Sequence, residues 1–140
     1  MTENQQKADH YLMQIRNADK EMRQIFEQIQ FLRYKASGMG AIRYDKDHIQ
    51  TSPEDMVCEC IAQAVQLENI LFARNRRLHD SLTHTNEILQ LWNDNNNARL
   101  ITIYYLNHGS MGDVAEQIGC SSRNAYFIKL KALEEFSKHL

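Results

Sequence analysis

The sequence is poor in residues that break helices. It has one proline and five glycines among 140 residues, and 43% of its residues are apolar. This composition permits long helices and leaves few turn residues, and the length allows one or two small domains. We therefore expect an all-α fold.

Cysteine is also scarce and is not arranged as a metal site. Cys58 and Cys60 lie two apart in a predicted helix, so their side chains point about 200° apart, and Cys120 is distant in sequence. They are interpreted as reduced, small apolar residues. The six histidines are scattered singly, and there is no glycine-rich phosphate loop or nucleophile elbow. We expect no metal, no cofactor and no enzymatic activity.

Long hydrophobic runs are missing as well. No stretch approaches the apolar run that is needed to span a membrane, and the N-terminus Met-Thr-Glu-Asn-Gln-Gln is too polar for a signal peptide. These features predict a cytoplasmic protein that does not enter a membrane.

What the sequence does contain is a long apolar heptad seam near its N-terminus. Apolar residues recur at alternating spacings of three and four from Ala8 to Ala36, which predicts a long helix that must bury this stripe. Gly38 and Gly40 are predicted to end the helix, with residues 37–51 as a connector. The seam residues assigned to oligomerisation are Ile15, Met22, Ile25, Ile29 and Leu32.

A second long helix is predicted from Pro53 to Trp92. Ser52 offers an N-cap, Pro53 suits the first helical position, and Glu54 and Asp55 suit the positive end of the helix dipole. The asparagine-rich run 93–97 is predicted to stop it. Two such helices most simply form an antiparallel hairpin over residues 1–92. Since two helices do not close a core, we expect a homodimer or a higher even oligomer; the alternative is a monomer whose C-terminal helices cover the hairpin.

Residues 93–140 have the pattern of a helix-turn-helix domain. Ser110 and Asp113 suit the first turn of a short helix, Gly119 suits a left-handed C-terminal position, and Ser121 can cap a second helix two residues later. Small residues at Ala115 and Ala125 permit close approach of the two helices. The segment therefore predicts two short helices joined by a tight turn.

The outer face of the second short helix carries cations and no acid, which favours DNA binding in the major groove. Arg suits guanine, Asn suits adenine, and Lys suits phosphates. The alternative is a helical pair that only packs. The residues assigned to DNA contact are Ser110, Ser121, Ser122, Arg123, Asn124, Tyr126, Phe127, Lys129 and Lys131.

Net charge limits how DNA could be held. Five Lys and Arg residues in 93–140 are balanced by five Asp and Glu residues, and the whole chain is formally −2. A neutral domain gains little from phosphate attraction alone. Affinity for double-stranded DNA must therefore come from oligomerisation or from a second DNA-bound partner such as host RNA polymerase. Arg74, Arg76 and Arg77 either touch DNA or form a solvated face.

Two stretches resemble known families. The run 104–121, Tyr-Tyr-Leu-Asn-His-Gly-Ser-x-x-x-Val-Ala-x-x-Ile-Gly-Cys-Ser, followed by Ala132-Leu133, is similar to the region-4 helix-turn-helix of sigma-70-type factors. The connector from Tyr44 to Pro53 resembles that of small phage and prophage regulators of the ArpU and RinA type. The resemblance implies a sequence-specific regulator of late phage or mobile-element transcription, with Arg123, Asn124, Lys129 and Lys131 on its reading helix.

Two other classes of protein fit the same pattern. A DNA-packaging small terminase subunit joins a helix-turn-helix to an oligomerising helical part, usually with the DNA-binding unit first in the chain, whereas here it is last. A coiled-coil interaction protein would keep the hairpin and bind no DNA.

Overall fold

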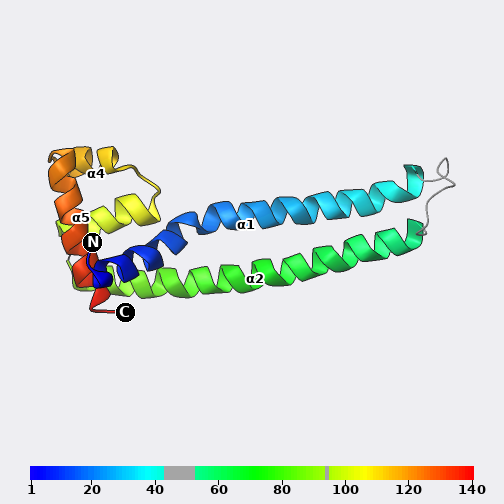
Figure 1. The fold of residues 1–140 in the computed structure, drawn as a ribbon, viewed down its shortest axis with the longest axis horizontal. Helices are drawn as coiled ribbons and strands as arrows, with labels where there is room; N and C mark the ends of the chain where they lie inside the picture. The colour runs from blue at the N-terminus through cyan, green and yellow to red at the C-terminus, as the bar shows by residue number, and fades with distance from the viewer. Residues whose placement is uncertain (43–52, 94) are drawn as a thin grey trace. The chain divides into compact units, whose positions relative to one another are not determined.

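The computed structural model describes residues 1–42, 53–93 and 95–140, and the elements in this part of the chain are all helical (Figure 1). In chain order they are α1 (Glu3–Ile42), α2 (Pro53–Leu91), α3 (Asn96–Ile101), the π-helix η2 (Thr102–Leu106), α4 (Met111–Ile118) and α5 (Ser122–Ser137).

The chain forms two compact units whose boundary differs from the one predicted at residues 92 and 93. Unit 1 joins residues 1–19 to residues 78–140, and unit 2 is residues 20–77. Both long helices therefore contribute to both units. The physical reason lies in the apolar residues at the start of α1 and the end of α2, which are buried together with those of the C-terminal helices.

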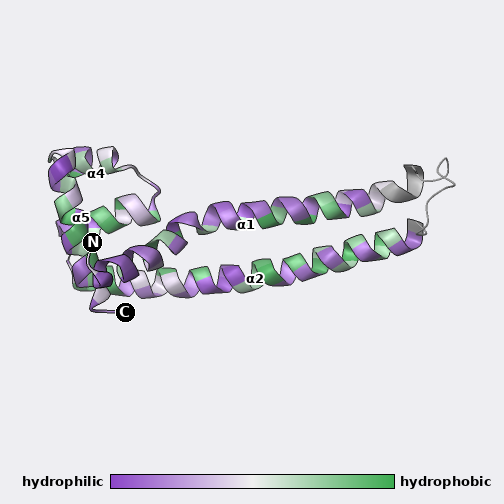
Figure 2. Cartoon of the chain, in the orientation of Figure 1, coloured by the Kyte–Doolittle hydropathy of each residue, from purple (hydrophilic) through white to green (hydrophobic). Residues whose placement is uncertain are grey.

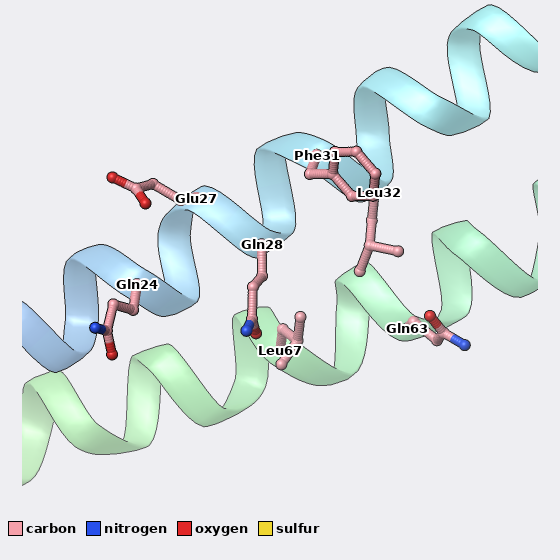
Figure 3. A pocket seen from close by; sticks show the side chains of 7 residues that line it. All are labelled: Gln24, Glu27, Gln28, Phe31, Leu32, Gln63 and Leu67. Atoms are coloured by element: carbon pink, nitrogen blue, oxygen red, sulfur yellow. The ribbon is translucent and has the colours of Figure 1, made fainter.

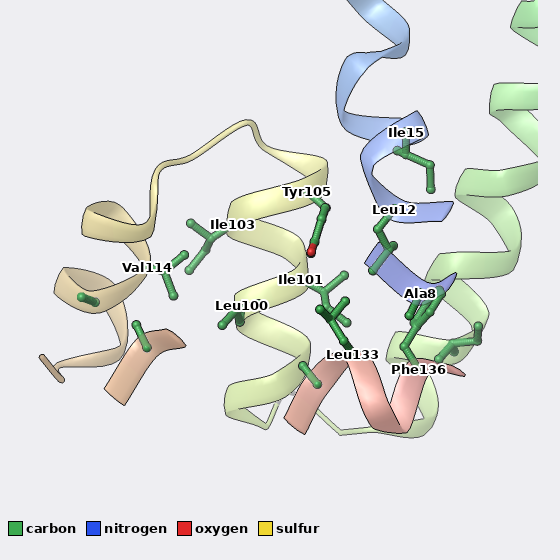
Figure 4. Close-up of a cluster of buried hydrophobic side chains, with 14 residues drawn as sticks. Ala8, Leu12, Ile15, Leu100, Ile101, Ile103, Tyr105, Val114, Leu133 and Phe136 are labelled. Carbon is green, nitrogen blue, oxygen red and sulfur yellow. The ribbon is translucent and has the colours of Figure 1, made fainter. Parts of the chain in front are cut away.

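The core of unit 1 is a cluster of buried side chains from distant parts of the chain (Figure 4). Leu12 from α1 is fully buried with Leu100 and Ile101 of the α3 segment and with Leu133 and Phe136 of α5. Burying a side chain of this size contributes about 1.5–3 kcal/mol, so these residues dominate the stability of the unit. The C-terminal helices thus fold onto the N-terminal turns of α1.

Hydrogen bonds at the start of α1 reinforce this packing. Gln5 donates from Nε2 to the Leu130 carbonyl oxygen at 3.1 Å, and the Thr2 hydroxyl donates to Glu134 at 3.0 Å. Residues 1–19 are therefore held by α5 through polar as well as apolar contacts.

The first long helix continues past the glycines that were predicted to end it. α1 extends to Ile42, so the prediction of an end at Gly38 and Gly40 is wrong. Glycine lowers helix stability by about 1 kcal/mol relative to alanine but keeps its backbone N–H, so it does not stop a helix that is otherwise favoured. The rest of the predicted connector, residues 43–52, lies outside the described residues.

The second long helix agrees with its predicted bounds. α2 begins at Pro53, with Glu54 and Asp55 in its first turn, and ends at Leu91. Asn93 then adopts a left-handed backbone with φ 50°, and the Asn95 side chain caps α3 by accepting from the Ala98 N–H at 2.9 Å. Asn93 thus follows the end of α2 with a backbone that leaves the helical region, and the Asn95 side chain supplies the first hydrogen bond of α3.

In unit 2 the segments of α1 and α2 run antiparallel. Glu21 pairs with Arg74 at 3.2 Å and Arg33 pairs with Glu68, so the two sequences are matched in opposite directions. Ile29 is only 4% exposed in this pair, and Met22, Ile25 and Leu32 are half-buried. These seam residues are thus covered, wholly or partly, within one chain, and Ile15 is buried in unit 1.

Two helices leave this unit incompletely closed. A groove between them is lined by glutamines and by half-buried Leu32 and Leu67 (Figure 3). Large apolar side chains remain exposed on the same unit, including Phe26, Phe31 and Phe72. Apolar residues recur along this part of α2 (Figure 2). Unit 2 therefore presents more apolar surface than a two-helix pair can cover.

The expectation that no stretch approaches a membrane span is wrong for α2. Among the described residues, this helix has an 18-residue window with mean hydropathy 1.3, of which 11% is buried. The expectation failed because it considered uninterrupted apolar runs, whereas this window mixes apolar with scattered polar residues. Length and composition do not by themselves distinguish a membrane span from another apolar helix.

Candidate functional site

The predicted DNA-contact residues lie at the position before α4, in the turn before α5, and on α5 itself. Before α4, the Ser110 hydroxyl accepts from the Asp113 N–H at 3.1 Å, and the Asp113 carboxylate accepts from the Ser110 N–H at 2.9 Å. This reciprocal pair satisfies two backbone donors at the start of the helix. Two hydrogen bonds lower the pKa of Asp113 from its ordinary 3.8. The bond from the Ser110 backbone has the larger effect, and the bond with the Ser110 side chain has the smaller one.

The turn after α4 has the geometry that the sequence predicts. Gly119 is left-handed with φ 81°, and the backbone N–H groups of Gly119 and Cys120 both donate to the Ala115 carbonyl oxygen at 2.9 Å. Ser121 then caps α5 by accepting from the Asn124 N–H at 3.2 Å. Since glycine adopts this conformation without a Cβ clash, α5 can begin after a turn of only three residues.

Buried residues fix α4 and α5 to the rest of unit 1. Val114 and Ala125 are fully buried and Ala115 is 7% exposed, in the same cluster as Leu133 and Phe136. Because one side of each helix is used for packing, the opposite side of α5 faces solvent.

The exposed side of α5 begins at its first turn. Ser122, Arg123 and Asn124 are exposed, as is Lys131 two turns later. Tyr126 and Phe127 are 46% and 47% exposed, and the Arg123 guanidinium lies 5.8 Å from the centre of the Phe127 ring. Cationic, amide and aromatic groups thus share this surface, which we call the α5 face (Ser122, Arg123, Asn124, Tyr126, Phe127 and Lys131).

Three predicted contact residues have other partners. Lys129 is half-buried, with Nζ 4.7 Å from the centre of the Tyr104 ring. The hydroxyls of Ser110 and Ser121 accept the capping bonds described above. The structure therefore places Lys129 in a packing role and the two serines in capping roles.

The arginines of α2 lie in unit 2 and are exposed. Arg74 pairs with Glu21, whereas Arg76 and Arg77 have no ion pair among the described residues. They belong to a different compact unit from the α5 face.

Arg16 is a site residue that the sequence analysis missed. Its Nη1 donates to the carbonyl oxygens of Tyr104 at 2.6 Å and Gly109 at 2.9 Å, and its guanidinium lies 4.3 Å from the centre of the Tyr104 ring. It thereby holds the end of η2 and the segment before α4. No local signal marks this role, because its partners lie about ninety residues away in sequence.

Tight packing at Gly109 fixes the same segment. A Cβ at this position would lie 2.8 Å from both the Ile103 side chain and the Ile103 carbonyl oxygen, and the Gly109 N–H donates to that oxygen at 2.8 Å. The π-helix and the chain before α4 therefore meet at a contact that only glycine fits.

A buried tyrosine links α1 to η2. Tyr105 is fully buried and its hydroxyl donates to Asp9 Oδ1 at 2.5 Å. Burial, and then the hydrogen bond to Asp9 and its negative charge, raise the pKa of Tyr105 far above its ordinary 10.0. The neutral phenol is therefore the form that stabilises this contact.

Nothing in this arrangement assembles a metal centre. Within residues 1–42, 53–93 and 95–140, no group of three or more His, Cys, Asp or Glu side chains is placed to hold a metal ion. The α5 face can supply hydrogen-bond donors, positive charge and stacking surfaces, which are the chemistry of macromolecular recognition.

Comparisons with family models, with curated proteins and with solved structures gave no match. The connector that resembles the ArpU and RinA type lies mostly outside the described residues.

Proposed function

We propose that this protein is a sequence-specific DNA-binding regulator whose helix α5 enters the major groove. The observation that carries the proposal is the pair α4 and α5, joined by the left-handed Gly119, with Arg123 and Asn124 exposed in the first turn of the second helix. In helix-turn-helix proteins, residues at that end of the second helix contact base edges.

Each exposed polar residue has a role in this proposal. Arg123 donates to guanine and Asn124 makes paired hydrogen bonds to adenine, whereas Lys131 contacts phosphates. Lys129 is the exception, since its ammonium group lies over Tyr104. We assign it to the support of the site together with Arg16.

The neutral charge of residues 93–140 affects how the DNA is held. One copy gains little from nonspecific phosphate attraction, so binding needs a second copy or a DNA-bound partner such as RNA polymerase. The resemblance to sigma-70 region 4 and to ArpU and RinA regulators favours late-gene control in a phage or mobile element. Such a regulator acts in the cytoplasm and needs no cofactor.

A mobility-shift assay on DNA upstream of the neighbouring operons, with and without RNA polymerase, tests the proposal. We expect a specific complex that Arg123→Ala weakens by about 1–3 kcal/mol, with relaxed preference at one base position. Asn124→Ala is expected to weaken the specific complex in the same way as Arg123→Ala. Lys131→Ala should weaken binding to all sequences and make its salt dependence shallower.

Lys138→Ala is the matched control, because Lys138 is exposed at the far end of α5. It should leave the specific complex unchanged. Absence of any sequence preference at every salt concentration, or full binding by an Arg123→Ala, Asn124→Ala double variant, would exclude α5 as a reading helix.

The second candidate is a protein-interaction module, favoured by the exposed rings of Tyr126 and Phe127. Exposed aromatic residues beside an arginine are typical of protein interfaces. Under this alternative, Tyr126→Ser and Phe127→Ser abolish partner binding while the chain binds no DNA. Under the first proposal, the loss of Arg123 reduces DNA affinity.

A further inference from the structure

One side of α2 in unit 2 carries an exposed stripe with a symmetric pattern. In a helix of 3.6 residues per turn, the residues of this stripe lie within about 80° of one another around the helix axis. Its spacings run four, three, four, four, three, four and so read the same in both directions from Val65. This stripe, which we call the α2 stripe, consists of Glu54, Cys58, Ile61, Val65, Asn69, Phe72 and Arg76.

The α2 stripe is not the side of α2 that packs within the chain. Cys60 and Ala64 are buried at 7% and 0% exposure and lie about 140° and 100° around the helix from Val65, the centre of the stripe. Ile61 is 43% exposed, Val65 44% and Phe72 69%. α2 therefore has two apolar sides, one covered by α1 and one open to solvent.

Charge along α2 is segregated in a way that indicates what covers the stripe. Residues 53–68 contain four acids and no lysine or arginine, whereas residues 69–77 contain three arginines and no acid. Glu54 and Arg76 stand at opposite ends of the stripe, and neither has an ion pair among the described residues. A partner helix that complements this side has its own charges in the reverse order.

A second copy of the same helix, turned antiparallel, has that order. We propose that the α2 stripe is a self-association surface in which two copies of α2 pack antiparallel about a two-fold axis at Val65. Val65 then faces its own copy, Ile61 faces Asn69, Cys58 faces Phe72, and Glu54 faces Arg76. The Val65 pair lies on the axis and each of the other contacts occurs twice, as a two-fold interface requires, and both charged ends are matched.

This interface does not depend on the proposed DNA binding and uses residues other than the predicted seam. It differs from a membrane contact in its charge, because a membrane-surface helix is typically rich in Lys and Arg beside its apolar face, whereas the first half of this segment is acidic.

The first experiment measures the oligomeric state of the full chain by sedimentation. We expect a dimer that Val65→Asp converts to monomer. Ile70→Asp is the matched control, because Ile70 is also 44% exposed on α2 but lies about 140° from Val65 around the helix. Circular dichroism of both variants separates loss of the dimer from loss of the fold.

The second experiment tests the charge pairing. Glu54→Arg or Arg76→Glu alone places like charges opposite each other twice, and we expect dimer dissociation constants raised roughly tenfold. The double variant with both changes restores the pairing and should return the constant close to that of the original chain. Additive weakening in the double variant would overturn the antiparallel register.

Crosslinking tests the direction directly. In a background of Cys58→Ser, Cys60→Ala and Cys120→Ala, Ile61→Cys and Asn69→Cys proteins are oxidised separately and as a mixture. The antiparallel pair predicts a disulfide only in the mixture. Crosslinking of each protein with itself indicates a parallel pair and overturns the proposal.

Three further results would also overturn it. These are a monomer at all concentrations, equal effects of Val65→Asp and Ile70→Asp, and binding of the chain to phosphatidylcholine or phosphatidylglycerol vesicles without dimer formation.

Discussion

The guanidinium of Arg16 lies 4.3 Å from the ring centre of Tyr104, and Arg16 Nη1 donates to the Tyr104 carbonyl oxygen at 2.6 Å. One side chain of α1 thus contacts both the ring and the backbone of one residue of η2. Lys129 of α5 also lies near this ring, at 4.7 Å. Tyr104 is therefore the point where three helices of unit 1 meet.

Arg16→Ala should lower the unfolding free energy by about 2 kcal/mol, because two carbonyl oxygens lose a charged donor and a ring loses its cation. Arg16→Lys should recover only part of this, since an ammonium group lacks the planar guanidinium that lies against the Tyr104 ring while Nη1 reaches both carbonyl oxygens. Thermal unfolding is the measurement. Arg23→Ala, at an exposed arginine of the same helix, is the control, and equal melting temperatures for both alanine variants would contradict the role of Arg16.

Tyr105 predicts an alkaline limit to stability. Its pKa is raised in the folded protein, so the neutral phenol stabilises the fold fully below pH 10.0, and this contribution is lost as the pH rises further and the unfolded chain ionises. The loss is about 1.4 kcal/mol per pH unit. Tyr105→Phe should flatten this alkaline decline in urea unfolding, whereas Tyr126→Phe should keep it. An unchanged slope in Tyr105→Phe would show that another group sets the limit.

Asp113 predicts the opposite pH dependence. Its pKa is lowered by the Ser110 backbone and side chain, so the carboxylate stabilises the start of α4 above pH 3.8, and this contribution is lost as the pH falls through the lowered pKa. Asp113→Asn should therefore be less stable than the original chain at neutral pH, with the difference shrinking below pH 3.8. Glu116→Gln, at an exposed acid of the same helix, should show no such convergence. A pH-independent difference would place the effect of Asp113 elsewhere.

Three glycines should respond differently to alanine. Gly109→Ala should cost about 2 kcal/mol, because the new Cβ meets a backbone oxygen at 2.8 Å. Gly119→Ala should cost about 1 kcal/mol through its left-handed backbone. Gly38→Ala should stabilise α1 by about 0.5–1 kcal/mol, since the position is helical and open. Chemical unfolding of the three variants checks this order, and a stabilising Gly109→Ala would refute the close contact.

Local hydrogen bonding explains what could be predicted at the candidate site. The caps at Ser110 and Ser121 and the left-handed Gly119 agree with the sequence analysis, because each bond joins residues at most five apart. The predicted end of α1 at Gly38 was wrong, because glycine only weakens a helix. The surrounding residues decide whether the helix continues, and here α1 extends to Ile42.

The sequence by itself determined the helical character, the start of α2 at Pro53, the break at Asn93 and the turn at Gly119, since these depend on backbone preferences of a few neighbouring residues. Only the tertiary structure decided that residues 1–19 complete the C-terminal core, that Arg16 supports Tyr104 and that Lys129 lies over its ring. The physical reason is that an amphipathic stripe specifies that it must be buried but not which distant surface buries it.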